Sequence, residues 1–276
     1  MQRFVPHKLL TLLIGFLASS EVPFLKNLLI RLFVLIYKPN LNEAIHSDYK
    51  HYASYNDFFT RRLKEGARII DLSESAFISP VDGEIVDHGL IKKRKLIQAK
   101  NYEYDLGELI GDSYQSRYEE GYFITIYLAP TDYHRIHCPL EGKITHSDHM
   151  GEDLYSVNKK AQDSIPNLYI KNERAVLQIS SKYTNYSLVS VGASIVGSIV
   201  PYWNTKKKAS RKKLIEEWKK GPESDSFKKQ GEELAYFKMG STVIILIEDS
   251  NKLDLDSLKE NKLVKFGNNL ISLKRT

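Results

Sequence analysis

Cysteine is nearly absent from this chain of 276 residues. Cys138 is the only one, so an intramolecular disulfide is impossible and a cysteine-rich metal site is excluded. Long apolar runs are missing too. The two best, Leu9 to Ala18 and Leu28 to Tyr37, are shorter than the about 20 residues that a membrane-spanning helix needs. A polytopic membrane protein is therefore excluded.

What is present is typical of a folded protein with one sizeable core. Apolar residues make up 42% of the chain and charged residues 27%, which argues against extensive disorder. The formal net charge of +6 fits a soluble basic surface, a nucleic-acid footprint or a face that sits on anionic lipid. Composition alone does not choose among these three.

Residues 1–40 combine basic side chains with the two apolar runs. Five basic residues stand against one acid, Glu21, and Pro23 separates the runs. This pattern predicts two short amphipathic helices lying at a membrane surface, peripheral on the cytoplasmic side of the cell membrane. Two alternatives remain: the helices belong to an ordinary globular core, or the basic start followed by Ala18-Ser19-Ser20 is a secretory signal peptide.

Beyond residue 68 the chain shows short alternating strands broken by turn residues, which is typical of a β-rich domain. We therefore expect an α+β protein with an N-terminal helical membrane-docking segment over 1–67 and a barrel-like or sandwich-like β domain over 68–276. The lysine-rich stretch from Lys206 to Lys229 is predicted to be a solvated loop or a lipid-facing one. Helical periodicity is weak beyond residue 68, and Leu214 to Trp218 in this stretch is the exception.

Three segments carry residues suited to chemistry. They are the Asp-Gly turn at Asp82, the loop holding His134 and His137, and the Gly240-Ser241 pair ahead of an apolar strand. Each alone is explained by a turn or a loop. Together, Asp82, His137 and Ser241 supply the acid, base and hydroxyl of a nucleophilic triad.

The serine sits in an unusual setting for a hydrolase. It follows Gly240 directly, and the Gly-x-Ser-x-Gly elbow of many hydrolases is missing. A glycine carbonyl has no neighbouring side chain to shield it, and glycine tolerates strained backbone angles. The hydroxyl of Ser241 could therefore attack the peptide bond that precedes it.

Zinc is a rival explanation for the histidines. His134 and His137, and then His146 and His149, have the spacing of ligand pairs. Neither pair falls on an obvious helix and no catalytic glutamate accompanies them, so we expect no metal.

Seven short motifs in order resemble the pyruvoyl-dependent phosphatidylserine decarboxylases of the bacterial and mitochondrial type. The resemblance covers about Leu28 to Ile247. Two departures are Met239, where the family has leucine, and Gln98-Ala99-Lys100, where it has Lys-Gly before a tyrosine. The motifs lie at residues 55–59, 79–83, 132–139, 155–158, 172–174, 191–199 and 237–242.

The resemblance implies a self-processing enzyme. Cleavage between Gly240 and Ser241 would give chains 1–240 (β) and 241–276 (α), which stay together as a heterodimer that can dimerise further. Ser241 would become a covalent pyruvoyl group, so pyruvate is the cofactor and neither metal nor nucleic acid is needed.

The resemblance also implies the reaction. The pyruvoyl carbonyl forms a Schiff base with phosphatidylserine in a membrane, and loss of carbon dioxide gives phosphatidylethanolamine, a step of phospholipid biosynthesis. His134 would return a proton, and Ser156 would contact the substrate phosphate. Three other hypotheses stay open: a serine hydrolase using the same triad, an inactive membrane-binding β protein, and a decarboxylase of archaeal-type lipids.

Overall fold

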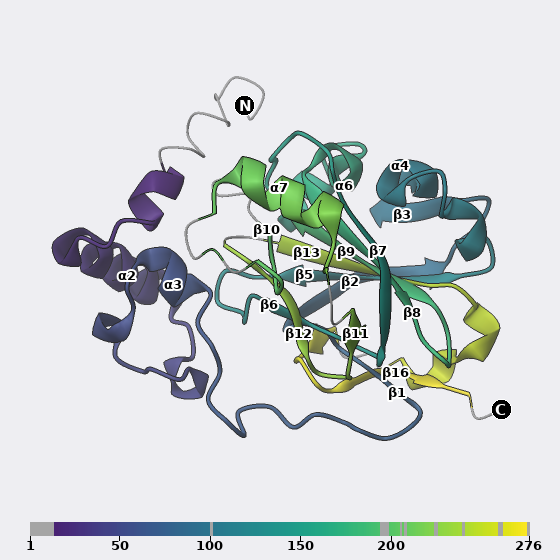
Figure 1. Ribbon diagram of the computed structural model, residues 1–276, viewed down its shortest axis with the longest axis horizontal. Helices are drawn as coiled ribbons and strands as arrows, with labels where there is room; N and C mark the ends of the chain where they lie inside the picture. Colours follow the sequence, from purple (N-terminus) through teal and green to yellow (C-terminus); the bar gives the residue numbers. More distant parts are fainter. Residues whose placement is uncertain are drawn as a thin grey trace.

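The computed structural model describes residues 14–99, 102–193, 199–204, 206, 209–223, 226–238, 241–258 and 262–274. The predictions that concern Met239, Gly240 and most of the first apolar run lie outside the described residues. The described chain has a group of N-terminal helices beside a larger body rich in strands (Figure 1).

The α-helices are α2 Pro23–Tyr37, α3 Tyr55–Phe59, α4 Leu106–Ile110, α5 Lys159–Gln162, α6 Leu168–Lys171 and α7 Arg211–Lys220. Short 3-10 helices span Leu41–Glu43, Tyr49–His51, Gln115–Tyr118, Ser250–Lys252 and Leu255–Ser257. The strands are β1 Ala76–Ile78, β2 Gly83–Leu90, β3 Lys95–Ala99, β4 Tyr102–Asp105, β5 Tyr122–Leu128, β6 Arg135–His137, β7 Gly142–Met150, β8 Arg174–Ser180, β9 Tyr186–Gly192, β10 Ile199–Pro201, β11 Phe227–Lys228, β12 Glu233–Phe237, β13 Ser241–Ile247, β14 Leu253–Asp254, β15 Leu263–Val264 and β16 Asn269–Leu273.

The centre of the body is an antiparallel sheet of eight strands in the order β11-β7-β8-β9-β13-β5-β2-β15. In the part of the chain that is described, the end strands β11 and β15 do not pair with each other, so this sheet is open rather than a closed barrel. Together with the short N-terminal helices, it confirms the predicted α+β class.

Strand β13 is buried along its whole length because both faces of the sheet are covered. Side chains alternate between the faces of a strand. Val243 and Ile245 accordingly join one apolar cluster, while Ile244 and Leu246 join the other. A continuous apolar run is what a strand covered on both faces requires.

A small sheet of order β10-β12-β6 carries the segment with the two histidines. Helix α7 packs against β10 and β7: the Trp218 indole nitrogen donates to the Ile199 carbonyl at 2.9 Å, and the Ser147 hydroxyl to the Trp218 carbonyl at 2.5 Å. The lysine-rich stretch, predicted as a loop with a helical pattern only from Leu214 to Trp218, contains helix α7. Leu214 and Trp218, one turn apart and both buried, hold that helix to the body.

The N-terminal helices have an apolar cluster of their own. Ile30 and Phe33 of α2 pack against Phe58 and Phe59 at the end of α3. The N-terminal helices are bonded to the strand-rich body, because the Arg135 guanidinium of β6 donates to the Thr60 carbonyl at 2.9 Å. Within the described chain, no helix has both the length and the apolar character to cross a membrane.

Candidate active site

Ser241 is the first residue of β13 and lies between two neighbouring strands. It is paired with Leu128 of β5 on one side and with Gly192 of β9 on the other. The residue is fully buried, and its hydroxyl has no hydrogen-bond partner among the described residues. Buried hydroxyls are normally bonded, so an unbonded one at the predicted reactive position marks a candidate for chemistry.

His134 presents a free imidazole nitrogen in a buried setting. Its Nδ1 donates to the carbonyl of Asp132 at 2.8 Å, which leaves the lone pair on Nε2. Nε2 has no partner in the described part of the chain, and the ring packs on Phe59 with 4.2 Å between ring centroids. Burial lowers the pKa of His134 to about 3, so the ring is neutral at pH 7.

His137 is also buried, but both ring nitrogens are bonded. Its Nδ1 donates to the carbonyl of Gly231 at 2.8 Å, and the Tyr133 hydroxyl donates to Nε2 at 3.0 Å. The ring stacks on Phe266, and burial lowers the pKa of His137 to about 4. Its Nε2 is thus a neutral acceptor that Tyr133 occupies.

The two histidines lie at different ends of the β6–β12 pair. His137 is opposite Glu233 at the start of β12. The carbonyl of His134 instead accepts from the Phe237 backbone nitrogen at 2.9 Å, at the end of β12 that leads to Ser241. The His134 backbone is thus bonded to the end of β12 after which Ser241 follows in sequence.

Asp82 is held by residues outside the predicted triad. One of its oxygens accepts from the Phe266 backbone nitrogen at 2.8 Å, and both accept from the Arg68 guanidinium, at 3.3 and 2.5 Å. Arg68 also pairs with Glu43 at 2.8 Å. Among the described hydrogen bonds none joins Asp82 to His137, or His137 to Ser241. The structure instead brings Asp82 and His137 together through Phe266.

A cavity of about 370 Å³ opens beside Asp82, with Lys38, Arg61 and Asp132 also in its wall. Burial raises the pKa of Asp132 to about 6, and the nearby Asp82 adds to the rise. Asp132 and Tyr133 belong to the same motif as the two histidines, so the sequence alone could have indicated that they lie close to the site. Arg68 and Phe266 belong to none of the motifs.

Ser156 lies in the loop between β7 and α5 and is partly exposed. The adjacent residue Tyr155 is tied to Asn172, and Asn172 is tied to Gly192, the β9 partner of Ser241. The loop is thereby linked to the start of β13.

The other histidine pair is dispersed. His146 stacks on Tyr114 with 5.0 Å between ring centroids, whereas Nε2 of His149 lies 4.0 Å from a carboxylate oxygen of Glu173. The described residues contain no group of three or more histidine, cysteine or acidic side chains that could hold a metal ion.

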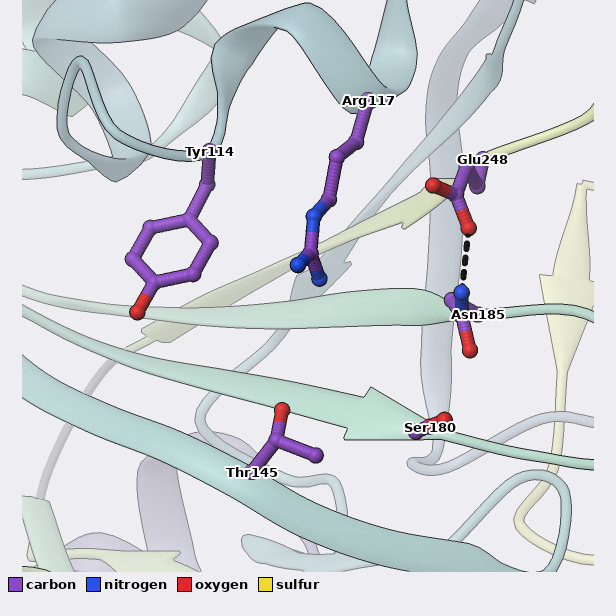
Figure 2. Close-up of a pocket in the computed structure, with 6 residues that line it drawn as sticks. All are labelled: Tyr114, Arg117, Thr145, Ser180, Asn185 and Glu248. Atoms are coloured by element: carbon purple, nitrogen blue, oxygen red, sulfur yellow. Dashed lines mark hydrogen bonds between the residues drawn. The ribbon is translucent and has the colours of Figure 1, made fainter.

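A separate cavity of about 500 Å³ lies beyond the other end of β13 (Figure 2). Glu248 lines it and accepts from the Asn185 amide at 2.5 Å, the bond drawn in Figure 2. Because Glu248 follows the last residue of β13, this cavity is roughly 20 Å from Ser241 along the strand. It is not part of the candidate site. Its lining residues are Tyr114, Arg117, Thr145, Ser180, Asn185 and Glu248.

Comparison with known proteins identifies the family. The model of the phosphatidylserine decarboxylase family matches residues 55–272, and a second model, described as PSD, matches residues 1–38. A relative from Methylobacillus flagellatus is 41% identical over 255 residues, 92% of this chain and 90% of its own length. One from Psychrobacter cryohalolentis is 38% identical over 276 residues, 99% of this chain and 98% of its own length.

A third relative, from Vibrio parahaemolyticus, is 38% identical over 265 residues, 95% of this chain and 93% of its own length. All three are named phosphatidylserine decarboxylase proenzyme. The match to the family model, over residues 55–272, includes Asp82, His134, His137 and Ser241. The chain belongs to the phosphatidylserine decarboxylase family.

Proposed function

We propose that this enzyme converts phosphatidylserine to phosphatidylethanolamine with a pyruvoyl group that it makes from Ser241. The names of the relatives support the substrate and the decarboxylation, and the word proenzyme supports processing. The observation that carries the proposal is the fully buried Ser241 hydroxyl, which lacks a partner among the described residues and starts the central strand.

The proposed processing uses only groups of the chain and one water. The Ser241 hydroxyl loses its proton and attacks the carbonyl carbon of Gly240, so the peptide bond is exchanged for an ester. Loss of the α-proton of residue 241 then eliminates the Gly240 carboxylate and leaves dehydroalanine. Addition of water and release of ammonia turn this residue into the pyruvoyl group.

Asp82, His137 and Ser241 remain our proposed triad for this cleavage, with His137 taking the proton of Ser241. For this, Nε2 of His137 has to exchange the Tyr133 hydroxyl for that of Ser241, or Tyr133 has to relay the proton. One observation favours a second assignment, in which His134 is the base: its Nε2 is neutral and unpartnered among the described residues.

The surroundings of Ser241 fit a small electrophilic group. Ser241 and His134 are both fully buried, and Nε2 of His134, without a partner among the described residues, is a neutral acceptor. The pyruvoyl group supplies a carbonyl for the substrate amine and an electron sink for the departing carboxylate. We propose that Nε2 of His134 takes a proton from the substrate ammonium and returns it to the α-carbon. The Ser156 hydroxyl would bind the phosphate.

We further propose that the two products stay joined as a heterodimer. Segment 241–276 contributes β13, which is paired on both sides, and β16, which lies between β1 and β14. The remaining segment, 1–67, is proposed as the membrane-docking part that brings the 68–276 catalytic domain to its lipid, peripherally on the cytoplasmic side.

Intact mass measurement of the purified full chain tests the proposal. We expect two chains, 1–240 and 241–276, the smaller one blocked at its N-terminus, together with release of carbon dioxide from phosphatidylserine micelles. Ser241→Ala should leave one chain without activity. Ser190→Ala, which removes another buried serine from the neighbouring strand β9, is the control and should process normally.

A folded single chain that releases no carbon dioxide would overturn the proposal. If that chain also reacts with a phosphonate at Ser241, the serine hydrolase hypothesis gains support instead.

A further inference from the structure

The loop that carries Ser156 is fixed at Tyr155 by one buried side chain. Asn172 is completely buried, and its Oδ1 accepts from the Tyr155 backbone nitrogen at 2.9 Å. Its Nδ2 donates to the Tyr155 carbonyl at 2.8 Å and to the Gly192 carbonyl at 2.9 Å. A single amide therefore satisfies both backbone groups of Tyr155 and ties them to β9.

A second amide fixes the other side of Ser156. Nε2 of Gln162, from the end of α5, donates to the Val157 carbonyl at 2.7 Å, and both residues are buried. Leu154 is buried as well. The residues on both sides of Ser156 are therefore anchored, whereas Ser156 itself is partly exposed.

The hydroxyl of Ser156 is arranged to donate. Its oxygen lies 3.4 Å from the backbone nitrogen of Asn158, which donates to it. An oxygen that accepts from the backbone still has its own hydrogen available for an anionic oxygen. Hydrogen bonds to charged groups are among the stronger ones, and they are strongest when the donor is already oriented.

We propose that Asn172 and Gln162 are positioning residues, which hold the Ser156 hydroxyl in place for the phosphate of the substrate. The inference rests on the proposed function, and it explains why the Ser156 loop is bonded to β9. Nδ2 of Asn172 bonds both Tyr155 and Gly192, and Gly192 is paired with Ser241. The amide thus sets the spacing between the phosphate-binding loop and the residue that meets the substrate amine. A rigid spacing selects headgroups in which phosphate and amine are separated by the serine carbons.

The test compares Ser156→Ala, Gln162→Met and their double variant in the full chain. Gln162→Met keeps the volume of the side chain but removes the donor to Val157, and Gln162 stands on α5, outside β13 and the strands paired with it. We expect normal processing and an increase of about tenfold in KM for phosphatidylserine in mixed micelles, with kcat changed much less. The double variant should be no worse than Ser156→Ala, because Gln162 acts through Ser156.

Asn172→Asp tests the other proposed positioning residue independently. It places an oxygen against the Tyr155 and Gly192 carbonyls, so we expect a higher KM together with slower processing. Gln178→Met is the matched control: Gln178 is a buried amide on β8 whose Oε1 accepts from Tyr118 and Ser187 at 2.8 and 2.5 Å. It should lower the melting temperature and leave KM unchanged.

An unchanged KM in Gln162→Met, or effects of Gln162→Met and Ser156→Ala that multiply in the double variant, would overturn the inference. Failure of the proposed function is seen separately. In that case the unsubstituted chain stays whole in the mass spectrum and releases no carbon dioxide.

Discussion

The ring of Phe266 lies flat on the imidazole of His137, with 3.7 Å between the ring centroids and 16° between the planes. The backbone nitrogen of the same Phe266 donates to Asp82 at 2.8 Å. The strand just before it, β15, pairs with β2, which begins next to Asp82. One residue near the C-terminus thus contacts two members of the predicted triad.

Replacing Phe266 with alanine should slow self-cleavage. The loss of the stacked ring lets water reach His137, so the pKa of His137 should rise from about 4 toward its ordinary 6.5 and the ring should be held less firmly. We expect processing to be slower by about tenfold or more, since positioned proton transfer contributes on the order of 100-fold or more. The measurement is a time course of precursor and products after a pulse of synthesis. Phe266→Leu, which keeps an apolar cover, should be less affected, and equal rates in all three proteins would contradict the idea.

The two histidines should be separable by substitution. His137→Ala should leave a full-length precursor, because the proposed base for cleavage is lost. His134→Ala should still give two chains but lose most decarboxylation, because its proton is needed only in the second reaction. Intact mass and release of carbon dioxide measure the two steps. The reverse pattern would transfer the role of cleavage base to His134, whose Nε2 has no partner among the described residues.

Much of the fold was predictable because it depends on local pattern. The alternating strands and the apolar run after Ser241 predicted a β-rich body, and β13 has the burial that such a run implies. In the lysine-rich stretch the helical signal from Leu214 to Trp218 was visible, but charge dominates the composition, so the full length of α7 was not predicted.

For the site, the sequence supplied candidate reactive residues, whose roles stay predictions. Motifs pointed to Asp82, His137 and Ser241, but no pattern reports which side chains meet in space. Arg68 reaches Asp82 from the connection after α3, and Phe266 reaches it from a C-terminal turn. Such partners depend on long-range packing, which sequence spacing does not encode.

The free energy of unfolding should fall on acidification. The pKa of His137 is lowered to about 4 and that of His149 to about 4, both mainly by burial. Between about pH 6.5 and pH 4 the unfolded chain therefore binds protons that the folded chain does not, and stability present above pH 6.5 is lost as pH falls. Asp132 acts in the opposite sense, since its raised pKa of about 6 favours the folded state in acid. His134, whose pKa is also lowered, acts in the same sense as His137 and His149, so the net effect of acidification is a loss of stability.

Urea unfolding at several pH values between 7.5 and 5 measures this slope, at about 1.4 kcal/mol per pH unit for each net proton. His149→Gln removes one buried histidine outside the proposed chemistry and should flatten the curve by up to one proton. The exposed His51 is the control: His51→Gln should leave the slope unchanged. A slope that His149→Gln does not alter would show that His149 is not held neutral.

The apolar face of α2 should carry membrane binding. Ile30 and Phe33 face inward, whereas Phe24, Leu35 and Ile36 are 79%, 71% and 67% exposed. Burying such side chains contributes about 1.5–3 kcal/mol each, so replacing all three with serine should reduce affinity for phosphatidylserine vesicles by far more than tenfold. Because the buried face is untouched, self-cleavage should persist. Vesicle flotation and intact mass measure the two properties.

The matched control replaces Ile69, Leu72 and Leu263, which are 84%, 71% and 79% exposed on the body. If both triple variants lose binding equally, exposure alone explains the effect. If the α2 variant still floats, another surface docks, and the basic helix α7 becomes the next one to test.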